Sequence, residues 1–128
     1  MNETNKALDS EILIDEITLK KEQVAEIDKA IEEIKAQAEL AKAIVDLRND
    51  EKYIKVIENA YFKSEGERIS KCLLDPTPLK RDQIENMMEM MSAIRILKTF
   101  LLHREHDGSN SEERIQELND YRTQVLSN

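Results

Sequence analysis

The feature that most constrains the fold of this chain is a stretch from about Asp9 to Arg48 that contains neither glycine nor proline. Its apolar residues alternate at spacings of three and four, interrupted only by Lys20. This heptad pattern is typical of a helix that meets another helix along one narrow seam, wound left-handed around it. The predicted seam consists of Leu13, Ile17, Val24, Ile27, Ile31, Ile34, Ala38, Ala41 and Val45.

The length of this helix predicts that part of it meets another chain. Forty residues of helix span about 60 Å, whereas the remaining residues fold to a body about 25 Å across. Isoleucine at both apolar heptad positions favours more than two chains over a dimer. The alternative is that the helix packs on its own chain. A wider apolar stripe with Leu40, Ile44 and Leu47 predicts that the helix joins its domain around residues 38–48.

The rest of the chain also predicts helices. Asn49 or Asp50 caps a helix over 51–62, and a capping box at Ser64 to Glu67 opens a short one. Pro76 stops that helix, Thr77 with Pro78 begins a long one to about Arg104, and a last helix follows. The predicted fold is all-α, with a long N-terminal coiled-coil-like helix joined to a small bundle of about four further helices. The predicted boundaries are 1–8 for a flexible N-terminus, 9–48 for the long helix and 49–128 for the bundle.

Four of the five methionines fall within Met87 to Met91, on the long helix that precedes Gly108. The apolar stripe there is wider than one neighbour requires, so the helix is expected to be central. Methionine suits such a place because its thioether fills irregular gaps. An exposed methionine groove for partners and soft-metal ligation are the alternatives. The predicted bundle core and partner contacts are Tyr53, Ile57, Tyr61, Phe62, Arg68, Met87, Met88, Met91, Ile94, Phe100 and Leu101.

Charge and motif content argue against catalysis and cofactors. The net charge of −8 opposes nucleic acid and anionic membranes as partners. His103 and His106 lie three apart at a helix end, where they suit the helix dipole better than a metal. Cys72 lies among leucines and has no evident activating base. With two glycines in total, a phosphate-binding loop is nearly excluded. The sequence therefore predicts no catalytic, cofactor-binding or metal site.

One segment resembles a family. The phrase NDEKYIKVIENAYFKSEGERISKCLLDP, followed by a long and a closing helix, resembles small helical proteins of unsettled function encoded by tailed bacteriophages. The matching residues are Asn49, Tyr53, Val56, Ile57, Tyr61, Phe62, Glu65, Glu67, Arg68, Ile69, Leu73, Leu74, Asp75 and Pro76. The match covers about residues 40–126, and Ala60 and Cys72 depart from the family pattern. The resemblance implies a phage protein made in the bacterial host cytoplasm, with a role in the virion or its assembly.

Together these observations predict a non-enzymatic, homo-oligomeric helical phage protein. It would be a structural or assembly component of the virion that docks a larger capsid, portal or tail element. Its partners would be further copies of itself, three or more chains in all, and that larger protein. The alternative is a host-takeover or counter-defence protein that binds a bacterial protein through its acidic surface. A third reading is nucleic-acid association through local basic residues, namely Lys80, Arg81, Arg95, Lys98 and Arg104.

Overall fold

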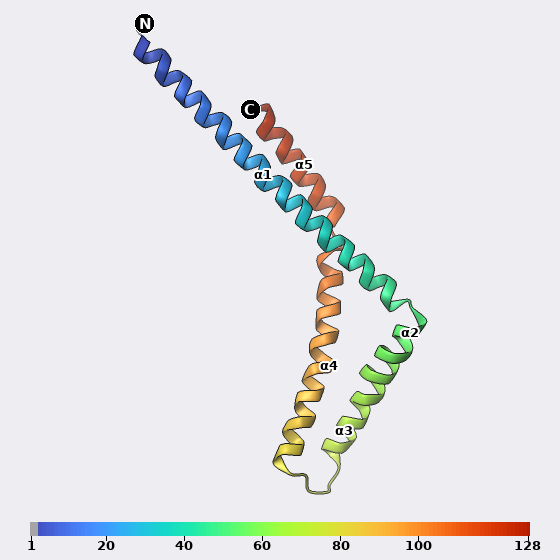
Figure 1. Ribbon diagram of the computed structural model, residues 1–128. Coiled ribbons are helices and arrows are strands. Elements are labelled where there is room, and N and C mark those ends of the chain that lie inside the picture. The colour runs from blue at the N-terminus through green and yellow to red at the C-terminus, as the bar shows by residue number, and fades with distance from the viewer. Residues whose placement is uncertain (1–2) are drawn as a thin grey trace. The chain divides into compact units, whose positions relative to one another are not determined.

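The structure is a computed structural model that describes residues 3–128, and every regular element in this range is a helix (Figure 1). This confirms the all-α prediction. In chain order the elements are α1 (Glu3–Arg48), α2 (Glu51–Tyr53), the π-helix η1 (Ile54–Glu65), α3 (Gly66–Leu74), α4 (Arg81–Asp107) and α5 (Ser111–Ser127). Residues 1–2 of the predicted flexible N-terminus lie outside the described residues, and from Glu3 onward that segment is helical.

The predicted long N-terminal helix is confirmed as α1, which runs for 46 residues without interruption. It has no internal proline or glycine to break its hydrogen bonds. The Asn49 N–H still bonds to Val45 O at 3.2 Å, and the chain then turns. Asp50 caps the next helix, because its Oδ1 accepts from the N–H groups of Lys52 at 2.9 Å and Tyr53 at 3.1 Å.

One continuous helical run leads from α2 through η1 into α3. The capping box predicted at Ser64 is wrong, because Glu65 has helical angles of φ −68° and ψ −39° and makes no capping hydrogen bond. The helix widens into a π-helix instead of ending. A continuous helix leaves no group of free backbone N–H donors at this point, so a capping box has nothing to satisfy.

The stop at Pro76 is confirmed, since α3 ends at Leu74 and Asp75 is extended with ψ 132°. The predicted cap at Thr77 is wrong. The Thr77 N–H donates to Asp75 Oδ1 at 2.8 Å, which forms a turn. Helix α4 begins only at Arg81, and the Gln83 Oε1 accepts from the Lys80 N–H at 3.0 Å.

The chain divides into two compact units, and the first combines Met1–Gln37 with Asn110–Asn128. In its described part α5 lies beside α1 (Figure 1). Ile27, Ile31 and Val125 form the buried cluster, and Val24, Ile115 and Leu118 pack against it. Arg122 Nε donates to Asp28 Oδ1 at 2.9 Å across the same pair of helices. The predicted boundaries grouped this last helix with the bundle at 49–128. Tyr121 on α5 is exposed.

The second unit comprises Ala38–Ser109. Within it α3 packs against α4, with the turn at 75–80 joining them (Figure 1). Ile69 on α3 is fully buried, Ile94 on α4 is 4% exposed, and Tyr53 is buried at the start of the helical run. Ala41 and Ile44, in the part of α1 that belongs to this unit, are buried as well.

Candidate interaction surfaces

One exposed surface of the first unit is formed by residues 9–19 of α1, which carry both apolar and acidic side chains. We call this segment the acidic tip. Every residue of this segment is exposed. Its five large apolar side chains, Ile12, Leu13, Ile14, Ile17 and Leu19, are between 47% and 61% exposed. Helix α5 reaches α1 only as far as Lys20, whose Nζ donates to the Asn128 carbonyl. The tip therefore lies beyond the part of α1 that α5 covers.

The charge of the acidic tip is of one sign. Asp9, Glu11, Asp15 and Glu16 are its four ionisable side chains. None of the ion pairs between described residues involves them. Apolar side chains occur around the helix rather than on one stripe, which is typical of a helix with more than one neighbour.

The predicted seam has different surroundings along its length. Leu13 and Ile17 are exposed, whereas Val24, Ile27 and Ile31 contact α5 of the same chain. Ile34 and Ala41 are buried, Ala38 is partly buried and Val45 is exposed. The exposed residues of the seam are therefore Leu13 and Ile17 in the acidic tip and Val45 near the end of α1.

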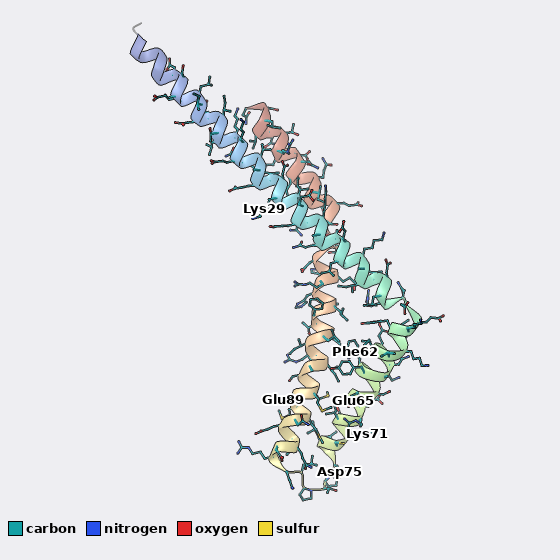
Figure 2. All side chains as sticks on the ribbon, viewed as in Figure 1. Lys29, Phe62, Glu65, Lys71, Asp75 and Glu89 are labelled. Atoms are coloured by element: carbon teal, nitrogen blue, oxygen red, sulfur yellow. The ribbon has the colours of Figure 1, made fainter. Side chains whose placement is uncertain are left out.

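The second surface is an open groove along η1 and α3, which we call the Gly66 groove. It encloses about 470 Å³ and is lined by Phe62, Lys63, Gly66, Glu67, Ser70, Lys71, Leu74 and Met91. The η1 and α3 members recur every four residues, so they share one face of the helical run. Phe62 and Lys71 are labelled in Figure 2 on neighbouring parts of this run. Leu74, at its end, is 83% exposed.

Gly66 forms an open notch in the floor of this groove. Its backbone is helical, with φ −59° and ψ −44°, so no special conformation requires glycine here. A Cβ added at this position would meet nothing within 4 Å. Glycine inside a helix costs about 1 kcal/mol relative to alanine. Neither the backbone nor the packing of this chain explains that cost.

A smaller hollow of about 230 Å³ lies where Arg48, Tyr53 and Glu58 face α4. Arg48 Nη2 pairs with Glu105 Oε1, and the Lys98 ammonium lies 5.1 Å from the centre of the Phe62 ring. Burial, followed by the charge of Glu58, raises the pKa of Tyr53. The cations of this hollow are already engaged, which suits a structural role.

The local basic residues do not all gather on one surface. Arg95, Phe100, His103 and Arg104 line a hollow of about 220 Å³ on α4, and the Arg104 guanidinium lies 5.9 Å from the Phe100 ring centre. Lys98 contacts Phe62 instead, and Arg81 pairs with Glu85 at 3.2 Å.

The predicted bundle contacts also differ in burial. Tyr53 and Ile94 are buried, whereas Ile57, Tyr61, Phe62, Met87, Met91 and Leu101 are half-buried. Met88 and Phe100 are exposed. Met91 reaches the Gly66 groove.

Arg68 makes its ion pair on its own helix rather than across the bundle. Its Nε donates to Glu65 Oε2 at 3.0 Å, and its Nη2 donates to Oε1. These hydrogen bonds lower the pKa of Glu65 and raise that of Arg68. Among the side chains that the structure describes, no three His, Cys, Asp or Glu residues are grouped so as to hold a metal.

Comparison of the chain with protein families, curated proteins and solved structures found no match. In the described residues, no helix combines the length and apolar character needed to cross a membrane.

The sequence analysis missed several residues of both surfaces. It did not select Ile12, Ile14 and Leu19, because they lie off the heptad seam. It also passed over Lys63, Gly66 and Lys71. The available signal was a glycine within a helical pattern, four residues after Phe62 and eight residues before Leu74.

Proposed function

We propose that this protein is a non-enzymatic helical homo-oligomer that serves as a structural or assembly component of a tailed-phage particle. The observation that carries the proposal is the acidic tip. Five large apolar side chains within eight residues of α1 are exposed, and no other helix of the described chain covers them. Contiguous exposed apolar surface marks interaction sites in soluble proteins.

The phage context comes from the resemblance of residues 40–126. The chemical features support a binding role over catalysis. The shifted pKa values of Glu65, Arg68 and Asp75 have local partners, Glu65 with Arg68 and Asp75 with Thr77, rather than a shared cavity. The Gly66 groove is open and mostly apolar in its lining. Such a surface suits a protein partner, and a larger particle protein would bind the assembled oligomer.

The test is the solution mass of the wild type and of Leu13→Asp/Ile17→Asp, measured by multi-angle light scattering. Both substituted side chains are exposed in the single chain, so the variant is expected to keep its helical circular-dichroism spectrum. We expect the wild type to be an oligomer and the variant to be a monomer, because association would bury two unpaired carboxylates per chain.

A matched control is Thr18→Asp, which adds one charge on the same segment without removing an apolar side chain. It is expected to weaken association less than tenfold. A monomeric wild type with an intact α1 would contradict the proposal and favour a binder of a host protein.

A further inference from the structure

We propose that the acidic tip of one copy docks in the Gly66 groove of another copy, so that the chains assemble head to tail. This inference rests on the proposed function and names the two surfaces that meet. The groove supplies an apolar floor with a notch, and the tip supplies an exposed apolar helix of opposite charge.

The charges of the two surfaces are complementary. The charged residues that line the Gly66 groove are Lys63, Lys71 and Glu67. Neither lysine takes part in an ion pair between described residues. The tip carries Asp9, Glu11, Asp15 and Glu16 and no base. Two tips side by side would bring these acids together, whereas a tip in the groove places them beside the lysines.

The shape of the Gly66 groove suits an approaching helix. A helix can approach another backbone closely only where the side chains between them are small. Gly66 and Ser70 are the smallest residues of the groove and lie one turn apart. Gly66 has open space above it and no conformational need to be glycine. An approaching apolar side chain such as Ile14 or Ile17 would occupy this space, which accounts for the glycine.

The lengths of the groove and of the acidic tip also match. The groove follows the helical run from Phe62 to Leu74, about 18 Å of helix. The apolar stretch from Ile12 to Leu19 is about 12 Å long, so the groove holds it with room for the flanking acids. Leu74, left 83% exposed at the end of the groove, would be covered by the docked helix.

The contact is heterologous, because two different surfaces meet. Such a contact closes into a ring or grows as a filament, depending on the rotation between neighbours. In such an assembly each chain contributes its acidic tip to one neighbour and its Gly66 groove to another.

The experiment exploits this asymmetry by mixing two variants. Leu13→Asp/Ile17→Asp keeps the groove and loses the tip. Gly66→Glu keeps the tip and fills the notch with an acidic side chain that a helix tolerates well. Each variant alone is expected to be a monomer by light scattering. An equimolar mixture is expected to form a complex of one chain of each, because an intact tip then meets an intact groove.

The matched control is Ala93→Glu, which adds the same charge at an exposed position of α4 outside the groove and is expected to assemble like the wild type. Reversing the charge with Lys63→Glu/Lys71→Glu is expected to weaken assembly at least tenfold. Adding Asp15→Lys/Glu16→Lys to the same chain is expected to restore it.

If the wild type assembles but Gly66→Glu assembles equally well, or the mixture stays monomeric, tip-to-groove docking is overturned while the proposed oligomer stands. A monomeric wild type would instead overturn the proposed function and this inference together.

Discussion

At the scale of single residues, most polar contacts of this protein are local. Arg68 and Glu65 share one face of one helical run, and Asp75 accepts the N–H of Thr77 two residues on. Arg68 was predicted from the sequence as a residue of the bundle core or of a partner contact. Its own helix supplied a carboxylate three residues away, and a partly exposed pair of this kind costs less desolvation than a buried one.

The Glu65 pair predicts a specific dependence of stability on pH. The carboxyl has a pKa below its ordinary value of 4.5 in the folded chain and returns to about that value on unfolding. The pair therefore stabilises the fold above that pH, and its contribution is lost as the pH falls through the lowered folded pKa. We expect Glu65→Gln to reduce the decline of the urea midpoint in acid. Glu67→Gln, which removes an unpaired neighbour, is the control and is expected to decline like the wild type.

At the scale of elements, the π-helix η1 is a feature that the periodicity of apolar residues did not predict. The sequence indicated helix on both sides of Ser64, and helix is present on both sides. A π-helix adds residues to each turn and so rotates the following face relative to an α-helix. Side-chain spacing alone does not distinguish this widening from two helices with a break, so the sequence analysis placed a capping box there.

The contact of α3 with α4 predicts a large effect at one residue. Ile69 is the only fully buried side chain of that size among the described residues. Ile69→Ala removes buried methyl groups and leaves a cavity, so we expect a loss of about 2–4 kcal/mol in the free energy of unfolding. The control is Ile96→Ala on α4, where the side chain is 62% exposed and lies outside the Gly66 groove, with an expected change within about 0.5 kcal/mol. Urea titration measures both, and equal losses would contradict the assigned burial.

At the scale of the whole molecule, the chain consists of two units with separate apolar clusters. Residues far apart in sequence, around Ile27 and Val125, form the first, and Ile69 and Ile94 belong to the second. Local unfolding of one unit is therefore expected without loss of the other.

Val125→Asp tests this expectation. An unpaired charge in the α1–α5 cluster is expected to release α5, because Val125 is 8% exposed there. Hydrogen exchange followed by mass spectrometry should show faster exchange in α5 and in its contact region of α1, with α3 and α4 still protected. Leu126→Asp, at an exposed neighbour, is expected to exchange like the wild type. Loss of protection throughout the chain would contradict two separately stable units.

The sequence by itself determined the all-α class, the uninterrupted α1, a cap at Asn49 or Asp50 and the stop at Pro76. These depend on local rules, namely the absence of helix breakers, the geometry of capping side chains and the restriction before proline. Only the tertiary structure decided that α5 takes up the seam around Ile27 and leaves the acidic tip exposed. A heptad stripe specifies that a helix will bind a neighbour but carries no information on which helix that is. Only the tertiary structure likewise shows that the space above Gly66 is open, because residues distant in sequence determine which neighbours pack there.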